Sequence, residues 1–192
     1  MADVFVDRDG VINRNRPDHV KSWSEFKFLP GSMEALVQLT RAGHRTFVIT
    51  NQAIVNRGVV SMETMVDISR RLADEVARHG GSVEAVLLCP HLPEERCGCR
   101  KPMPGLLLQA QEMLGAVLDD AYLIGDYSSD LEAALAVGCT PILVLTGRGQ
   151  RAYKAMCPED RHRYLVARDL RQAVDFIGSD GRGLRRAWAG KA

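Results

Sequence analysis

Residues 5–11 read FVDRDGV, and the rest of the chain can be interpreted around this stretch. An apolar run ends there in two aspartates, Asp7 and Asp9, which are followed by a glycine. Side chains at positions i and i+2 of an extended segment point to the same side, so both carboxylates are predicted to face one small volume. Two neighbouring carboxylates repel each other, and they need a cation, a shared proton or hydrogen bonds that separate their pKa values. The alternative is a strand that runs into an ordinary Asp-Gly turn.

The composition is that of a globular protein with one sizeable core. The 192 residues fit a single domain, and 46% of them are hydrophobic, which suffices for such a core. A net charge of +1 argues against an extended nucleic-acid surface. No apolar run approaches the roughly 20 residues that span a bilayer, and the N-terminus lacks the pattern of a secretory signal. We therefore expect a cytoplasmic protein without nucleic-acid or membrane partners.

Strands and helices are predicted to alternate along the chain. Strands are expected at residues 4–6, 45–50, 83–88, 121–124, 141–145 and 164–167, and helices at about 32–42, 61–79, 106–114, 129–137 and 169–177. This alternation predicts an α/β fold of three layers, with a mostly parallel sheet covered by helices on both faces. Residues 1–178 are expected to form one domain and residues 179–192 a flexible, Gly- and Arg-rich tail. Residues 13–29 are expected to form a flap beside the site, with its aromatic residues packed on each other, and residues 146–149 a flexible loop.

Polar clusters follow four of the predicted strands. The clusters are Asp7 with Asp9, Thr50-Asn51-Gln52, the loop from Cys89 to Lys101, and Asp126 with Asp130. In a parallel sheet these strand ends lie on one edge, where the residues meet. Carboxylates bind Mg²⁺, while hydroxyl, amide and ammonium donors suit phosphoryl oxygens, so the set predicts phosphoryl transfer. Taken singly, Thr50 could merely end a strand, Asp126 cap a helix and Lys101 be solvated.

The loop after the third predicted strand contains a possible zinc site. Its three thiols and one imidazole come from Cys89, His91, Cys97 and Cys99. A Cys₃His set is a complete tetrahedral shell and leaves no open position for chemistry, so a structural Zn²⁺ is predicted. In a reducing cytoplasm such crowding favours metal binding over disulfides. The loop leads directly into Arg100 and Lys101, so closing it would bring both cations to the pocket.

Four motifs carry a resemblance to a known family. They are Asp7-Arg8-Asp9-Gly10-Val11-Ile12-Asn13, Thr50-Asn51-Gln52, Cys99-Arg100-Lys101-Pro102, and Gly125-Asp126 followed by Asp130. In this order they resemble the haloacid dehalogenase (HAD) superfamily of phosphatases, over about residues 4–150. Within it they are most similar to the branch of heptose-bisphosphate and histidinol-phosphate phosphatases.

The resemblance implies a role for each site residue. Asp7 would form an aspartyl-phosphate, and Asp9 would protonate the leaving oxygen and later activate water. Thr50 and Lys101 would hold the transferring phosphoryl group. The Mg²⁺ ligands would be Asp7, the backbone carbonyl of Asp9 and Asp126, with Asp130 supporting them. The candidate substrate-binding residues are Asn15, Asp18, Asn51, Gln52 and Arg100.

Arg100 is the residue we expect to bind the distal part of the substrate. Its fork of donors suits a second phosphate or a pair of hydroxyls, whereas the alternative is a pair with Glu94 or Glu95. One departure from the family concerns Ala53-Ile54-Val55, where the family has a small residue and glycine. Ile54 does not easily adopt φ > 0, so we expect this loop to differ in shape.

Neither segment between the predicted site motifs has room for a separate cap domain. An open site of this kind could admit a sugar bisphosphate or a phosphate on a larger molecule. Together with the resemblance, this implies as the first hypothesis a Mg²⁺-dependent phosphatase that removes the 7-phosphate of a D-glycero-D-manno-heptose 1,7-bisphosphate. Histidinol-phosphate phosphatase is the alternative, because the zinc loop is short. A nucleic-acid 3′-phosphatase would need a basic groove, and a catalytically inactive scaffold protein would have lost one of the site residues. The expected partner is a small phosphorylated sugar, and the protein is expected to be a monomer.

Overall fold

The strands of this protein alternate their side chains between two apolar clusters. In the computed structural model, which describes residues 1–180, Val4 and Val6 of the first strand lie in one cluster and Phe5 lies in the other. The second strand does the same with Val48 on one side and Phe47 on the other. This alternation is the ordinary consequence of the pleat, and apolar residues on both faces indicate a sheet that is covered twice.

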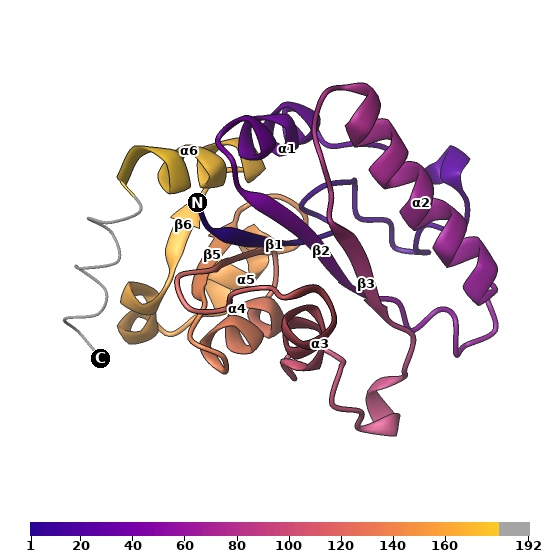
Figure 1. The fold of residues 1–192 in the computed structure, drawn as a ribbon. Helices are drawn as coiled ribbons and strands as arrows, with labels where there is room; N and C mark the ends of the chain where they lie inside the picture. The colour runs from indigo at the N-terminus through magenta and orange to yellow at the C-terminus, as the bar shows by residue number, and fades with distance from the viewer. Residues whose placement is uncertain (181–192) are drawn as a thin grey trace.

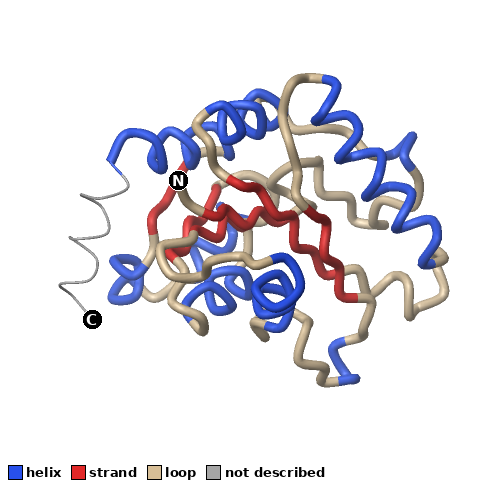
Figure 2. Tube along the Cα trace, in the orientation of Figure 1, coloured by secondary structure: helices blue, strands red, loops and turns tan. Residues whose placement is uncertain are grey.

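Six parallel strands form a single sheet at the centre of the molecule (Figure 2). They are β1 (Asp3–Asp7), β2 (Arg45–Asn51), β3 (Ala85–Cys89), β4 (Tyr122–Gly125), β5 (Thr140–Val144) and β6 (Leu165–Ala167). Their spatial order is β3-β2-β1-β4-β5-β6, and every neighbouring pair is parallel. The order reverses between β1 and β4, and ligands of open α/β sheets bind outside the carboxyl ends of the strands at such a point.

Helices cover both faces of this sheet (Figure 1). They are α1 (Ser32–Arg41), α2 (Met62–Arg78), α3 (Gly105–Leu114), α4 (Ser128–Leu135), α5 (Gly149–Ala155) and α6 (Leu170–Asp180), with short 3₁₀ helices η1 (Trp23–Glu25), η2 (Pro93–Glu95) and η3 (Pro158–Arg163). One apolar cluster takes residues from α1, α2 and α6, and the other takes residues from α3 and α4. The predicted three-layer α/β fold is therefore confirmed.

The connections after β1 and β2 contain no cap domain in the described part of the chain. Between β1 and β2 lie η1 and α1, and between β2 and β3 lies α2 alone. The rings of Trp23 and Phe26 stack at 4.9 Å, and Phe26 meets Phe28 edge-on at 5.1 Å, so the aromatic residues of the flap pack on each other as predicted. Within residues 1–180, no helix combines the length and the apolar character needed to cross a membrane.

Two features of the C-terminal third differ from the sequence-based expectation. Helix α5 begins at Gly149, at the end of the expected flexible loop, and was not predicted. Its only buried residue is Gly149, so it has no apolar periodicity by which it could be recognised. Helix α6 continues to Asp180, two residues into the segment that was expected to be a tail. The rest of that expected tail, residues 181–192, lies outside the described residues.

Candidate active site and metal centres

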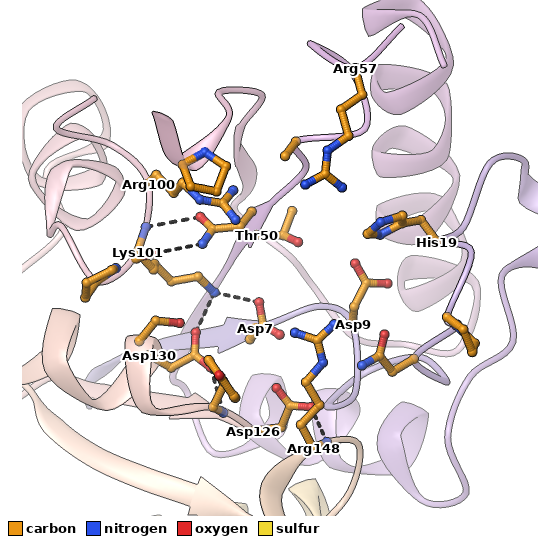
Figure 3. A pocket seen from close by; sticks show the side chains of 18 residues that line it. Asp7, Asp9, His19, Thr50, Arg57, Arg100, Lys101, Asp126, Asp130 and Arg148 are labelled. Carbon is orange, nitrogen blue, oxygen red and sulfur yellow. Dashed lines mark hydrogen bonds and ion pairs between the residues drawn. The ribbon is translucent and has the colours of Figure 1, made fainter. Parts of the chain in front are cut away.

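A cavity of about 550 Å³ opens at the carboxyl edge of the sheet, at the point where the strand order reverses. Asp7 is the last residue of β1, and Asp126 follows β4 immediately. Nine of the predicted site residues line this cavity: Asp7, Asp9, Asn15, Thr50, Asn51, Arg100, Lys101, Asp126 and Asp130 (Figure 3). The fold thus brings together residues from four separate strand ends.

Lys101 is the centre of a buried charge network. Its ammonium lies 2.6 Å from Asp7 Oδ1 and 2.7 Å from Asp130 Oδ1, and it donates to the carbonyl of Ile49 at 2.9 Å (Figure 3). Only 4% of the residue is exposed. Burial alone would lower the pKa of Lys101, but the Asp130 and Asp7 carboxylates outweigh it and raise the pKa, so the ammonium is charged.

Three carboxylates share this network with a single lysine. Oxygens of Asp7, Asp126 and Asp130 all lie within 4.8 Å of one another. Burial raises the pKa of Asp7 to about 8, because desolvation and the other two carboxylates outweigh the attraction of Lys101. Burial likewise raises the pKa of Asp126 to about 7. A cluster of buried carboxylates with excess negative charge is the donor set that a hard divalent cation such as Mg²⁺ fits.

Two glycines allow the backbone to approach Asp126 closely. A Cβ atom on Gly10 would lie 2.1 Å from Asp126 Oδ2, and one on Gly147 would lie 2.0 Å from the same oxygen. Both glycines also have positive φ angles, of 98° and 54°. The backbone N–H of Arg148 donates to Asp126 Oδ2 at 2.7 Å, and this bond orients the carboxylate. The Thr146–Gly149 segment is therefore a wall of the site.

Asp9 is held by three donors at the edge of the cavity. Its Oδ2 accepts from Arg8 Nη2 at 2.8 Å and from Gln52 Nε2 at 2.7 Å, and its Oδ1 accepts from Asn13 Nδ2 at 2.9 Å. Burial alone would raise the pKa of Asp9, but Arg8, Asn13 and Gln52 outweigh it and lower the pKa. The pKa values of Asp7 and Asp9 are thus shifted in opposite directions: the site favours the neutral form of Asp7 and the charged form of Asp9.

The amides after Thr50 bind protein groups. Asn51 forms two hydrogen bonds with the backbone of Lys101, donating to its carbonyl at 3.0 Å and accepting from its N–H at 3.1 Å. Gln52 donates to Thr50 Oγ1 at 2.8 Å as well as to Asp9, is 2% exposed and does not line the cavity. The structure therefore places Gln52 behind the site rather than at a substrate surface, and Asn51 is committed to the loop that carries Lys101.

The side chains of the four predicted zinc ligands lie close together in the segment that leads to Lys101. Cys89 Sγ lies 3.6 Å from Cys97 Sγ and 3.5 Å from His91 Nδ1. Cys99 Sγ lies 3.5 Å from Cys97 Sγ and 3.2 Å from His91 Nδ1. With Zn–S bonds of about 2.3 Å, two sulfur ligands of a tetrahedral ion stand about 3.8 Å apart. The four side chains consequently fit a tetrahedral zinc ion.

Within residues 1–180, several arginines around the cavity have no carboxylate partner in an ion pair. Arg100 Nη1 donates to the carbonyl of His91 at 3.2 Å and forms no pair with Glu94 or Glu95. Arg57 and Arg148 also line the cavity, as does His19 (Figure 3). Sequence reasoning missed these last three residues. The loop at residues 146–149 was a signal for Arg148, whereas nothing in the local sequence distinguishes Arg57 or His19 from solvated side chains.

Asp18 does not belong to the cavity. Its carboxylate is 55% exposed and pairs with Lys21 at 2.5 Å and with Arg16 at 3.0 Å. Its role in substrate binding remains a prediction, and in this structure its carboxylate pairs with Arg16 and Lys21 on the outer side of the flap. Asn15, from the same loop, does line the cavity.

The departure at Ile54 is accommodated by packing. Ile54 is 1% exposed and lies in the apolar cluster under α1, α2 and α6. The non-glycine residues with positive φ in the described chain are His19, Arg96 and Asp120, so Ile54 has an ordinary backbone conformation. The loop after Thr50 thus anchors itself in the core with a large apolar side chain.

The chain is similar to several known phosphatases. Residues 98–173 match a family model described as HAD-hydrolase-like. The D-glycero-β-D-manno-heptose-1,7-bisphosphate 7-phosphatase of Pseudomonas putida is 42% identical over 159 residues, which cover 83% of this chain and 91% of that protein. The Neisseria meningitidis protein of the same name is 38% identical over 151 residues, or 79% of this chain and 81% of that one.

A solved structure also resembles the whole described fold. It is the D,D-heptose 1,7-bisphosphate phosphatase from B. bronchiseptica complexed with magnesium and phosphate, with a TM-score of 0.86 and 34% sequence identity. The match covers 94% of this chain and 99% of that one. A second one, the D,D-heptose 1,7-bisphosphate phosphatase from Burkholderia thailandensis, has a TM-score of 0.71 at 32% identity and covers 94% of this chain and 100% of that one.

Proposed function

This chain belongs to the family of the D-glycero-β-D-manno-heptose-1,7-bisphosphate 7-phosphatases, among the HAD-like phosphatases, and from that premise we propose its substrate and the roles of its residues. The proposed reaction is hydrolysis of the 7-phosphate of D-glycero-β-D-manno-heptose 1,7-bisphosphate. The relatives favour this substrate over histidinol phosphate, because those of 38–42% identity carry the heptose name.

One observation carries the proposal: Asp7, Asp126 and Asp130 surround a charged Lys101 at the floor of an open cavity. The carboxylates supply a nucleophile and metal ligands, and the ammonium can bind a phosphoryl oxygen. Catalysis of phosphoryl transfer is mostly positioning and neutralisation of charge, and this arrangement can do both.

The proposed reaction has two steps, both at phosphorus. Asp7 must be ionised and Asp9 protonated at the start, the opposite of what their pKa shifts favour in the cation-free protein, and a cation beside Asp7 would favour its ionised form. An oxygen of the Asp7 carboxylate attacks the phosphorus, the bond from phosphorus to the sugar oxygen breaks, and that oxygen takes the proton of the Asp9 carboxyl group. In the second step a water oxygen attacks the phosphorus, Asp9 accepts a proton from that water, and the Asp7 carboxylate leaves. Asp9 is then protonated again and ready for the next substrate. Thr50, which lines the cavity, would hold the transferring group together with Lys101.

The two metals would have separate tasks. Asp7, the Asp9 carbonyl and Asp126, with Asp130 beside them, would hold a Mg²⁺, which would supply positive charge next to the phosphoryl oxygens. Cys89, His91, Cys97 and Cys99 would hold a Zn²⁺ that supports the loop and takes no part in the chemistry.

The distal phosphate of a bisphosphate would meet the cations at the rim. Arg57, Arg100 and Arg148 line the cavity and form no ion pair with a carboxylate of the described part of the chain, so their guanidinium groups are available to an anion. A sugar with one phosphate at the reaction centre and a second phosphate further out matches this distribution of charge better than a monophosphate does.

Phosphate release from a panel of substrates tests the proposal. The panel comprises both anomers of the heptose bisphosphate, a heptose 7-monophosphate, histidinol phosphate and a 3′-phosphorylated oligonucleotide, each with Mg²⁺ and with zinc-loaded protein. We expect the highest kcat/KM for the β-anomer of the bisphosphate. A higher kcat/KM for histidinol phosphate or for the oligonucleotide would refute the proposed substrate.

A further inference from the structure

Arg8 is a fully buried charge whose placement the proposed reaction does not yet explain. It is the largest of the fully buried side chains, at 0% exposure. Its Nη2 donates to Asp9 Oδ2 at 2.8 Å, its Nη1 has only the sulfur of Met65 at 3.8 Å, and its Nε has no hydrogen-bond partner. It does not line the cavity, so it cannot touch a substrate there.

The surroundings of Arg8 would suit an apolar side chain better than a guanidinium. Met65 is fully buried in α2 and belongs to the apolar cluster on that face of the sheet. A buried ion pair with unsatisfied donors is often no more stable than a well-packed apolar replacement. A buried polar group without a partner in a native structure calls for an explanation, and a role beside the reaction centre is one.

The contact that Arg8 does make fixes the orientation of Asp9. Arg8 and Gln52 reach Oδ2, while Asn13 reaches Oδ1, so both carboxylate oxygens are tethered. Arg8 is the only one of these three donors that carries a charge, and its side chain is 1% exposed against 25% for Asp9. The carboxyl group therefore extends from a buried anchor into the cavity, where a leaving oxygen would lie.

We propose that Arg8 is a positioning residue for proton transfer: from the core side it holds the Asp9 carboxyl group at the place from which a proton reaches the leaving sugar oxygen. This inference rests on the proposed function, because it needs Asp9 to act as the acid. Arg8, between the two aspartates in the sequence, would thus orient the carboxyl group of Asp9.

The role implies a dependence on the leaving group. When the bond from phosphorus to an alkoxide oxygen breaks, the oxygen must gain a proton, and a misplaced acid slows this step. A 4-nitrophenolate leaves as a stable anion and needs no proton from Asp9. A purely structural role of Arg8 would instead affect both kinds of substrate alike, through Asp7 and Lys101.

The experiment compares kcat/KM for the heptose bisphosphate and for 4-nitrophenyl phosphate in three variants, Arg8→Met, Arg8→Lys and Met65→Leu. For Arg8→Met we expect a loss of about 10²-fold on the sugar substrate, the size that a misplacement of about 1 Å can cause. The loss on the aryl substrate should stay within about threefold, because proton donation contributes little there. Arg8→Lys should give a smaller loss with the same preference. Met65→Leu replaces the thioether beside Arg8 Nη1 by an apolar side chain of similar size and should leave both values near those of the wild type.

Equal losses on the two substrates, or no loss on the sugar, would overturn the inference. If Arg8→Met does not fold, as judged by thermal unfolding and zinc content, the same two outcomes in Arg8→Lys decide. Asp9→Asn serves as the benchmark, since it removes the acid outright and should be selective in the same sense. A failure of the proposed function is distinguishable, because the wild type would then release no phosphate from the sugar bisphosphate.

Discussion

The carboxylate cluster and the zinc loop are both four-residue sites at one edge of the sheet, but they are built in opposite ways. Asp7, Asp126 and Asp130 with Lys101 come from distant strand ends and are largely buried, and their charges do not balance. The four Cys and His residues of the zinc loop come from the eleven residues 89–99, and their thiols and imidazole would fill the tetrahedral shell of one ion. The first site therefore has an excess of negative charge that a cation could neutralise, whereas in the second all four ligands would be used by one ion.

The largest expected effect is at the carboxylate cluster. Asp7→Asn should reduce kcat by at least about 10³-fold, because an amide is a poor nucleophile, yet should leave the melting temperature equal or higher. The reason is that burial raises the pKa of Asp7 to about 8, so the fold already favours a neutral side chain there. Activity and thermal unfolding measured on the same preparation check this. Near-normal turnover in the variant would rule out Asp7 as the nucleophile.

A change in the zinc loop should act on activity indirectly, through loss of the metal, and should reduce activity less than Asp7→Asn does. Cys97→Ser should release about one zinc per chain and lower kcat/KM by about 10²-fold, because the loop that presents Arg100 and Lys101 loses its anchor. Metal analysis and kinetics at saturating Mg²⁺ measure both effects. The matched control is Cys157→Ser, since Cys157 is an exposed cysteine outside the loop. If zinc is lost while activity is kept, the loop does not position the cations.

The same contrast explains how much of the molecule could be predicted from the sequence. The zinc ligands follow from spacing alone, since four ligands within one short loop can meet without any knowledge of the fold. The carboxylate cluster follows from spacing together with one rule, that the carboxyl ends of parallel strands share an edge. Both steps depend on residue type and position along the chain, which a sequence contains.

What could not be predicted depends on which partner a side chain finds. An amide such as Asn51 can bind a substrate or a backbone, and only the structure places its oxygen and nitrogen against Lys101. Asp18 has the chemistry of a site residue, but Arg16 and Lys21 neutralise it outside the cavity. The buried setting of Arg8 is equally invisible in a sequence, where arginines are mostly exposed.

Arg100 connects the two regions, and its loss tests to which of them it belongs. Arg100→Ala removes one charge-assisted contact of about 1.5–3 kcal/mol, which is roughly ten- to 150-fold in kcat/KM. We expect this loss for the heptose bisphosphate and a much smaller one for a small monophosphate. Arg100→Lys keeps the charge without the fork and should fall between the two. Equal losses on both substrates would show that the bond to the His91 carbonyl, and hence support of the loop, is its main task.

The smallest expected effect is on the pH dependence of the melting temperature, which should depend on the carboxylate cluster and not on the zinc loop. The folded state raises the pKa values of Asp7 and Asp126 to about 8 and about 7, from the usual 3.8. Between the usual and the raised pKa values the folded chain binds more protons than the unfolded one, so the free energy of unfolding of Mg²⁺-free protein should fall as pH rises from about 5 to about 8.5.

Mg²⁺ needs the ionised carboxylates and should raise the melting temperature more at the higher pH. At a hundred times its Kd the ion adds about 2.7 kcal/mol, or about 5–10 °C for a chain of this size. Thermal unfolding with and without Mg²⁺, in buffers free of chelators so that zinc stays bound, measures the difference. Asp7→Asn should weaken this dependence on pH and Cys157→Ser should not, whereas an effect of Mg²⁺ that is equal at both pH values would place the ion elsewhere than on these carboxylates.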